Sequence, residues 1–323
     1  MGNRSYLDAV RPHVSDENGG IAGSAKLRTM IVQNYITFAS ASMIERLRLG
    51  FYYCQRLITN LKVRRFSHRI LLFFLLRCFP HCTLAGPKPR AELKDFKSRG
   101  YIELAPILSD VQCQEIHSYL LTRPILDTKG SGKTFSLDDV PENCTIGDYP
   151  LSTVVNCPNV MELANHPDIL TLACEYLGFM PVITGMSLRW TFPHSNTPDK
   201  VQRFHRDCEM GSIKLMVYLT DVDAECGPHT FATGTHLDRM PVRLHPLPDN
   251  QVGGEHKVIL GSAGTTFFID TRGLHKGSIP TANPRLMLGV QYGLLPCPLF
   301  KYEPVPYTGS LKLQKYVNRL MTV

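Results

Sequence analysis

Hydrophobic and polar residues follow different periods in the first and second parts of this chain. From Thr29 to Leu49, apolar residues recur every three or four positions, which predicts an amphipathic helix. A basic and apolar stretch then ends in Arg69–Arg77, and Gly86–Pro89 has the composition of a linker. We therefore expect a basic, partly helical extension over residues 1–90, a folded domain over 91–300 and a C-terminal tail over 301–323.

The folded domain is expected to open with a short strand at Gly100–Leu104 and to continue with helices. Ser109 and Gln112 have the spacing of a capping box, which marks a helix N-terminus. Gly178 is placed to end another helix, because glycine adopts the left-handed conformation at helix C-termini without strain. The expected bounds are Ser109 to about Leu121 for the first helix and Asn165 or Asp168 to Leu177 for the second.

Strand-like runs dominate the remainder of the domain. They are rich in β-branched and aromatic residues and are separated by turn residues. The expected strands are Val182–Thr191, Ser212–Leu219, Lys257–Leu260, Thr265–Ile269 and Leu286–Tyr292. Many short strands after a few helices predict a mainly β sandwich or barrel with helices packed on one side.

Charge is distributed unevenly along the chain. Residues 1–100 contain 17 Lys and Arg against 6 Asp and Glu, whereas residues 101–323 contain 18 against 22. A chain-wide nucleic-acid surface would not be so lopsided, so we expect no nucleic-acid partner. The ten cysteines form no C-x-x-C pair, which argues against a zinc ribbon or a thioredoxin-type redox site. The first twenty residues are polar and include acidic ones, unlike a secretory signal, so we expect reduced thiols and a cytoplasmic location.

The basic charge is concentrated around residues 46–82. Ten Lys and Arg and no acidic residue occur between Arg46 and Arg90. The apolar run Ile70–Leu76 is far shorter than the roughly 20 residues needed to span a bilayer. Cations beside a short apolar run are typical of a segment that lies on an anionic membrane surface. A buried helix that covers the barrel would have the same composition, so both interpretations stay open.

A candidate metal site begins at His205 and Asp207. In an extended segment, side chains two positions apart project from the same face, so this imidazole and carboxylate would converge while Arg206 points away. The best candidate for a third ligand is His275, just after an apolar strand. Two histidines and one carboxylate leave three coordination positions open, which suits Fe(II) with an organic co-substrate and O2. Ten residues later, Arg285 could bind the distal carboxylate of a 2-oxo acid with both arms of its guanidinium.

Several ordered blocks over about residues 95–295 resemble the phytanoyl-CoA dioxygenase-like branch of the Fe(II)/2-oxoglutarate oxygenases. Phe204–Asp207 is similar to the H-x-D metal motif of that family, and Gly273–His275 with Arg285 is similar to its distal histidine and 2-oxoglutarate arginine. The other blocks are Gly100–Leu104 with Leu108–Ser109, Leu163–Leu170 with Leu177–Gly178, Tyr218–Asp223, Gly227–Phe231 and Gly234–His236.

The resemblance implies a double-stranded β-helix (jelly-roll or cupin-like) core with flanking helices. It implies Fe(II), 2-oxoglutarate and O2 as metal and co-substrates, with succinate and CO2 as products. The expected reaction is hydroxylation or another oxidation of an unactivated C–H bond in a small-molecule or lipid-like substrate. Halogenating relatives replace the metal-binding carboxylate with a small residue, so Asp207 favours hydroxylation.

Other polar residues are weaker candidates for this site. Ser278 and Arg189 are candidates for contact with 2-oxoglutarate or substrate, although each is more simply an ordinary polar residue of a loop or strand. Trp190 is most simply a core residue, with a cleft-lining role as the alternative. His229 and His236 are expected to support the site and not to bind the metal directly.

Two other functions fit the same residues. One is a non-catalytic β-helix module that binds a metal or ligand. A cupin-type metal hydrolase or isomerase is a weaker alternative, because it would not need Arg285. Since His205, Asp207, His275 and Arg285 are all intact, the sequence favours the enzyme.

Overall fold

The computed structural model describes residues 42, 43, 46, 57–79, 91–193, 199–207, 209–238, 241, 245–294 and 304–323. All of them belong to one compact unit, Gln33–Val323. The linker predicted at Gly86–Pro89 and nearly all of the helix predicted at Thr29–Leu49 lie outside the described residues.

Two antiparallel sheets form the centre of the fold. The large sheet has eight strands in the order β1-β9-β6-β11-β5-β4-β2-β3, and the small sheet has the order β10-β7-β8. The strands of the large sheet are β1 (Tyr101–Leu104), β2 (Ile125–Asp127), β3 (Thr134–Phe135), β4 (Ile146–Asp148), β5 (Val182–Thr191), β6 (Ser212–Tyr218), β9 (Thr266–Ile269) and β11 (Arg285–Gly293). Those of the small sheet are β7 (His229–Ala232), β8 (His256–Ile259) and β10 (His275–Gly277).

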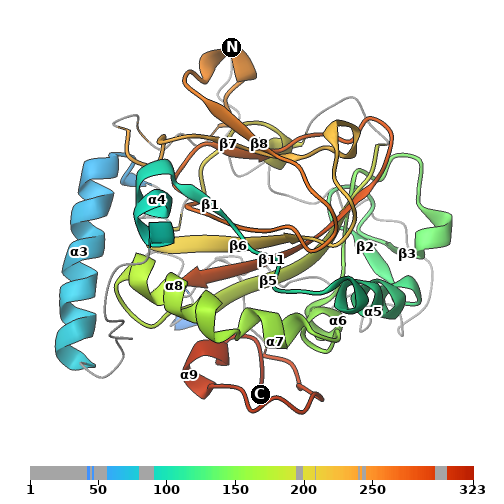
Figure 1. The fold of residues 1–323 in the computed structure, drawn as a ribbon, viewed down its shortest axis with the longest axis horizontal. Coiled ribbons are helices and arrows are strands. Elements are labelled where there is room, and N and C mark those ends of the chain that lie inside the picture. The colour runs from blue at the N-terminus through green and yellow to red at the C-terminus, as the bar shows by residue number, and fades with distance from the viewer. Residues whose placement is uncertain are drawn as a thin grey trace. The chain divides into compact units, whose positions relative to one another are not determined.

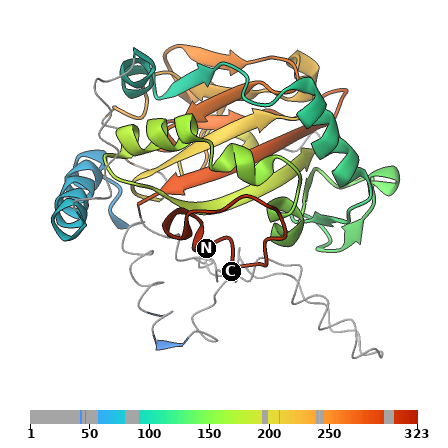
Figure 2. The same ribbon diagram turned by 60° about the horizontal axis from the view of Figure 1, so that its bottom comes forward.

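Helices cover the face of the large sheet that is turned away from the small sheet (Figure 1). The α-helices are α3 (Leu61–Cys78), α4 (Ala91–Arg99), α5 (Asp110–Leu121), α6 (Leu151–Val155), α7 (Val160–Ala164), α8 (Pro167–Leu177) and α9 (Lys315–Asn318). Short 3-10 helices are η2 (Leu137–Asp139), η3 (Lys200–Gln202), η4 (Ala224–Cys226) and η5 (Asp249–Gln251). Turning the view shows α8 lying across the strands of the large sheet (Figure 2).

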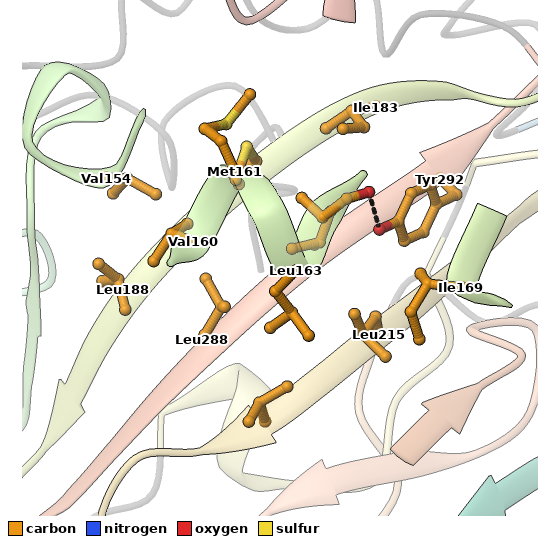
Figure 3. Close-up of a cluster of buried hydrophobic side chains, with 14 of the residues drawn as sticks. Val154, Val160, Met161, Leu163, Ile169, Ile183, Leu188, Leu215, Leu288 and Tyr292 are labelled. Atoms are coloured by element: carbon orange, nitrogen blue, oxygen red, sulfur yellow. Dashed lines mark hydrogen bonds between the residues drawn. The ribbon is translucent and has the colours of Figure 1, made fainter. Parts of the chain in front are cut away.

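The largest hydrophobic core lies between the large sheet and these helices. Apolar residues at alternate positions of β5, β6 and β11, such as Leu188, Leu215 and Leu288, meet side chains from α6, α7 and α8 (Figure 3). Tyr292 is fully buried there, and its hydroxyl donates to the Ala164 carbonyl at 2.8 Å. This bond satisfies a polar group that burial would otherwise leave unpaired.

The opposite face of the large sheet packs toward the small sheet. The apolar residues of this second core are Tyr101, Met216, Tyr218, Val222, Cys226, Phe231, Ile259, Phe267, Ile269 and Met287. Alternation along each strand therefore sends every second side chain into the space between the sheets. Lys214, Arg189 and Arg285 occupy positions of this inward-facing set.

Most of the predicted elements are confirmed, with small shifts of their ends. The capping box is present, because the Gln112 N–H donates to Ser109 Oγ and the Ser109 N–H donates to Gln112 Oε1. The second helix begins at Pro167 and ends at Gly178, which has φ +82°. The sequence pattern missed α4, whose nine residues carry only two buried side chains. Residues predicted as a C-terminal tail pack against the domain, with Val317 and Met321 buried.

Candidate metal and co-substrate site

His205 and His275 lie opposite each other on two extended antiparallel segments. The N–H of His205 donates to the His275 carbonyl at 3.0 Å, and the N–H of His275 donates back to the His205 carbonyl at 3.1 Å. The two ring centroids are 4.4 Å apart. Phe204, which is 1% exposed, fixes this segment in a small core of its own with Leu247 and Leu274.

The hydrogen bonds of the two imidazoles determine which nitrogen faces the site. His205 Nδ1 lies 2.9 Å from the Arg203 carbonyl oxygen, and His275 Nδ1 lies 3.0 Å from that of Gly273. A carbonyl oxygen only accepts, so each Nδ1 carries the proton and each Nε2 keeps a free lone pair in the neutral ring. This is the tautomer that binds a metal through Nε2, with the backbone orienting the ring.

Asp207 completes the cluster from the same segment as His205. Its N–H donates to the Thr271 carbonyl at 2.9 Å, and its Oδ1 lies 3.8 Å from His205 Nε2. One ligand atom from each of His205, Asp207 and His275 lies within 4.8 Å of the others. The structure therefore brings together the three residues that the sequence predicted as ligands, all within reach of one ion.

Lys214 on β6 also belongs to this site, and sequence reasoning missed it. Its Nζ donates to Asp207 Oδ2 at 2.6 Å, which leaves Oδ1 facing His205. The available signal was a lysine among the apolar residues of a central strand, where an unpaired cation would be costly. Lys214 thus orients Asp207 so that one carboxylate oxygen faces the histidines.

The charges of the site favour a metal-binding form. Burial, together with the neighbouring His205, lowers the pKa of His275 to about 3, so the ring is neutral near pH 7. Burial alone would raise the pKa of Asp207, but Lys214, His275 and His205 outweigh it and hold the pKa well below its usual range. His275 is therefore a neutral imidazole and Asp207 a carboxylate, the forms of these groups that metal binding requires.

Arg206 points away from the cluster, as the alternation predicted. Its guanidinium donates to the Thr235 carbonyl at 2.7 Å, to the Arg272 carbonyl, and to Asp238 Oδ2 at 2.8 Å. These bonds tie the segment with His205 and Asp207 to the turn before His275. Arg206 therefore supports the site from behind.

A buried ion pair holds the turn between β9 and His275. Asp270 is fully buried, accepts from Arg272 Nε at 2.9 Å and from the Tyr176 hydroxyl at 2.6 Å, and is also paired with Arg272 Nη2. Gly273 in the same turn has no room for a side chain, since a Cβ there would lie 2.2 Å from the Phe231 ring. Its carbonyl is the one that orients His275.

Arg285 lies close to the cluster at the beginning of β11. It is 3% exposed, and a Cβ on Gly277, two residues after His275, would lie 2.9 Å from its Nη2. Nη2 is also 3.5 Å from Thr191 Oγ1, whereas Nε and Nη1 have no hydrogen-bond partner among the described residues. Burial lowers the pKa of Arg285, although guanidinium remains charged near pH 7. A buried cation with two donors unpaired among the described residues could bind an anion.

His229 lies between Arg285 and the ligands. In the small sheet it pairs with Gly277, and its ring centroid is 5.7 Å from that of His275. Its side chain is buried, and neither ring nitrogen has a hydrogen-bond partner among the described residues. Burial, with His275 and Arg285 nearby, lowers the pKa of His229 well below its usual value. This ring is therefore a neutral, unpaired donor facing the interior.

The other candidate residues differ in their positions. Arg189 faces the same interior, but its guanidinium is paired with Asp148 at 2.6 and 3.0 Å. Trp190 lies on the opposite face of β5, in the core beneath the helices, and its Nε1 donates to the Tyr149 hydroxyl, so we leave it out of the site. Ser278 follows Gly277, and its N–H donates to the Pro228 carbonyl at 3.0 Å.

His236 is buried away from the ligands. Its Nε2 bonds to the Lys97 carbonyl at 3.0 Å, and Gly100 lies against its ring. It therefore joins the end of α4 to the loop after β7. This position agrees with the structural role predicted for it.

Solved structures with a similar fold exist, whereas comparison of the sequence with known families and curated proteins finds no match. No protein-family model matches the sequence, and no curated protein is significantly similar to it. The epimerase SnoN in complex with Fe3+, 2-oxoglutarate and nogalamycin RO is 18% identical, with a TM-score of 0.50 over 69% of this chain and 92% of SnoN. The carbocyclase SnoK from nogalamycin biosynthesis is 17% identical, with a TM-score of 0.46 over 64% of this chain and 84% of SnoK. HygX from Streptomyces hygroscopicus, with nickel, 2-oxoglutarate and hygromycin B bound, is 15% identical, with a TM-score of 0.46 over 64% of this chain and 87% of HygX.

SnoK and SnoN are both described as non-haem, 2-oxoglutarate-dependent enzymes. The likeness to SnoN, together with the two antiparallel sheets, confirms the predicted fold class. The resemblance to the phytanoyl-CoA dioxygenase-like family in particular stays a prediction. The chain has a double-stranded β-helix core with flanking helices.

Proposed function

We propose that this protein is an Fe(II)- and 2-oxoglutarate-dependent oxygenase. In this proposal His205, Asp207 and His275 hold the iron, and Arg285 binds the distal carboxylate of 2-oxoglutarate. The observation that carries it is the convergence of three ligand atoms within 4.8 Å, beside a buried arginine with two unpaired donors. The arginine does not serve the stability of the fold, because two of its donors have no partner among the described residues of the interior.

The donor set fits Fe(II). Two imidazole nitrogens and one carboxylate oxygen suit a divalent metal of this kind, and they leave positions for an oxo acid and O2. Both Nε2 lone pairs are free, and Asp207 presents one oxygen while Lys214 binds the other. The residues therefore orient the ligands before any metal binds.

The residues around the ligands provide the remaining functions. When bound, iron with 2-oxoglutarate and O2 supplies the oxidising power to break an unactivated C–H bond, with succinate and CO2 as co-products. Arg285 fixes one end of 2-oxoglutarate, and His229 is placed to donate to the same molecule. Arg285 is buried between the sheets, and exclusion of water there would strengthen its charged contact with the carboxylate of 2-oxoglutarate.

We infer hydroxylation or a related oxidation of a small-molecule or lipid-like substrate as the reaction. Asp207 occupies the position that a halogenating enzyme must leave open for halide. SnoN is an epimerase, so hydroxylation is not the single activity found on this fold. The SnoN structure contains nogalamycin RO, which supports a small organic molecule as the substrate class.

One observation favours a second candidate function, a non-catalytic module. Lys214 already binds one oxygen of Asp207. In a protein that never binds iron, this ion pair would stabilise an otherwise unpaired buried carboxylate. Iron affinity therefore separates the two candidates.

The test is anaerobic Fe(II) titration of the wild type and of His205→Ala and Asp207→Ala. Losing one of three ligands should weaken iron binding by on the order of a hundredfold or more and abolish succinate formation. His256→Ala is the matched control, because His256 is an exposed histidine of the same small sheet and not a ligand. Wild-type iron affinity in either ligand variant contradicts the assignment of the ligands. Wild-type protein that binds no iron supports the non-catalytic module.

A further inference from the structure

Helix α3 has two apolar faces, and only one of them is used by the fold. Leu61 and Arg64 are buried. Four leucines of the same face pack against the main hydrophobic core: Leu71, Leu72, Leu75 and Leu76. Four of the seven residues of Ile70–Leu76 therefore pack on the domain, as the interpretation of this run as a helix that covers the barrel expects.

The inner face fixes the rotation of α3 about its axis. Arg65 Nη2 donates to the carbonyls of Leu237 and Asp238 at 2.8 and 2.9 Å. Arg64 Nε donates to the Ile58 carbonyl at 2.6 Å, so it closes the turn before the helix. Leu72 lies against Gly178 at the end of α8. With these contacts in place, the opposite face cannot turn toward the core.

The outer face of α3 carries large apolar side chains in solvent. In both views α3 lies at the edge of the described fold, with one side turned away from the sheets (Figures 1 and 2). The exposed fractions are 46% for Val63, 63% for Phe66, 43% for Ile70, 61% for Phe73 and 59% for Phe74. Because they recur every three or four positions, these five form one continuous stripe, which we call the outer stripe. Single exposed apolar residues are ordinary, but a contiguous group marks an interaction surface.

The charges beside the outer stripe are all positive. Lys62, Arg69 and Arg77 are exposed, and the described residues 57–79 include no Asp or Glu. Lys62 and Arg69 are seven positions apart and therefore line one flank of the stripe, while Arg77 follows at its end. A partner must therefore accept phenylalanine side chains and offer negative charge on the same surface.

We propose that α3 docks this protein on the surface of an anionic lipid bilayer. The outer stripe would enter the boundary between headgroups and acyl chains, and the flanking cations would lie among the anionic headgroups. A bilayer meets both requirements without matching the shape of a rigid, convex helix. Among the described helices, none is long and apolar enough to cross a membrane, so α3 lies on the surface in this proposal.

Docking through α3 would also hold the active-site region near the membrane. The carbonyls that bind Arg65 belong to residues 237 and 238, and the Asp238 carboxylate binds Arg206 between the two ligands. The docked helix is thus one hydrogen-bonded step from the metal-binding segment. This arrangement suits a substrate taken from the lipid phase, and that part of the inference rests on the proposed function.

The test is co-sedimentation of the full chain with vesicles of phosphatidylcholine alone and with about 30% phosphatidylserine. We expect binding that requires phosphatidylserine and weakens with salt. Arg69→Gln/Arg77→Gln should lower the partition coefficient about thirtyfold, since each cation near the surface contributes about 1 kcal/mol. Phe66→Ser/Phe73→Ser/Phe74→Ser should lower it at least as much. Iron and 2-oxoglutarate affinity should be unchanged in all of these variants, so failure here is distinct from failure of the proposed function.

Matched control variants show whether losing exposed charge or exposed apolar side chains anywhere on the protein lowers vesicle binding. Val111→Ser/Leu121→Ser removes exposed apolar side chains from α5, and Lys94→Gln/Lys133→Gln removes exposed lysines elsewhere. Both control variants should bind like the wild type. The proposal is overturned if the wild type binds equally to vesicles with and without phosphatidylserine, or if it binds to neither. It is also overturned if the control variants lose as much binding as the α3 variants. Loss of a dimer in the phenylalanine variant, with vesicles ignored by the wild type, assigns the stripe to a second copy and also overturns it.

Discussion

Replacing Arg285 with methionine should change ligand affinity and stability in opposite directions. Arg285 is 3% exposed, and its Nε and Nη1 have no partner among the described residues. A buried donor without a partner costs about 1–3 kcal/mol. Methionine fills a similar volume without polar atoms, so Arg285→Met should raise the free energy of unfolding of the ligand-free protein by about that amount.

The same substitution should weaken 2-oxoglutarate binding strongly. Removing one partner of a buried, charge-assisted contact costs about 2–5 kcal/mol, which corresponds to about thirtyfold to several thousandfold in Kd. Arg285→Lys should recover only part of the affinity, because an ammonium group cannot donate in parallel to both oxygens of a carboxylate. Iron affinity should change far less, because Arg285 is not a ligand.

Arg189→Met provides the matched comparison. Arg189 faces the same interior from the neighbouring strand, but its guanidinium is already paired with Asp148 at 2.6 and 3.0 Å. Removing it leaves a carboxylate without its partner, so this variant should lose stability. It should also raise the Kd for 2-oxoglutarate less than Arg285→Met does.

Two measurements decide the case: urea unfolding of the ligand-free variants, and anaerobic calorimetric titration of the metal-loaded variants with 2-oxoglutarate. If Arg285→Met unfolds at lower urea than the wild type and binds 2-oxoglutarate normally, the arginine is structural. An unchanged Kd in both the methionine and lysine variants shows that the anchor lies elsewhere. Either result refutes the reasoning from unpaired donors.

Two further predictions concern groups on either side of the ligands. His229→Leu should leave the free energy of unfolding unchanged or raise it, since neither ring nitrogen has a partner among the described residues. It should also raise the Kd for 2-oxoglutarate roughly ten- to a hundredfold, because a hydrogen bond to a charged group is lost. The calorimetric titration described for Arg285 measures this, and normal affinity would exclude a ligand contact. For Asp270, burial would raise the pKa, but Arg272 outweighs it and holds the pKa at about 2. The stability that this carboxylate contributes, about 2–3 kcal/mol, is therefore complete above about pH 4 and lost as the pH falls to about 2. Asp270→Asn should lower the free energy of unfolding by about 3–5 kcal/mol at pH 7. Urea unfolding should show this difference from the wild type narrowing below pH 4, and a difference that stays constant with pH would contradict the linkage.

The sequence was sufficient to predict that His205 and Asp207 lie together, because their arrangement is local. His205 and Asp207 are two positions apart in an extended segment, so alternation alone places them on one face. His275 follows soon after an apolar strand, and few directions are open to a side chain at the end of a strand that lies between two sheets. Arg285 was predicted from its position ten residues after His275 and from the family resemblance, and its donors without partners among the described residues add a physical reason.

Contacts between distant strands were not predictable in this way. The pairs Lys214–Asp207 and Arg189–Asp148 depend on strand register and on the path of a loop, which no single stretch of sequence encodes. The helix α4 was missed because its mean composition is polar, and only Leu93 and Phe96 are buried in it. The outer stripe of α3 was also not predictable, because composition shows that a helix is apolar without showing which of its faces packs against the domain.

The pairing of charges explains how one arginine is selected as the ligand-binding group. Three long cationic side chains, Lys214, Arg189 and Arg285, face the interior between the sheets. Lys214 is held by Asp207 and Arg189 by Asp148, so a carboxylate ligand would have to compete with a partner already in place at either one. At Arg285 two donors are unpaired, and an incoming carboxylate gains charge-assisted hydrogen bonds without breaking an existing ion pair. We therefore expect a small dianion to bind with one end at Arg285 and its other end toward His275, because a Cβ on Gly277, two residues after His275, would lie 2.9 Å from Arg285 Nη2.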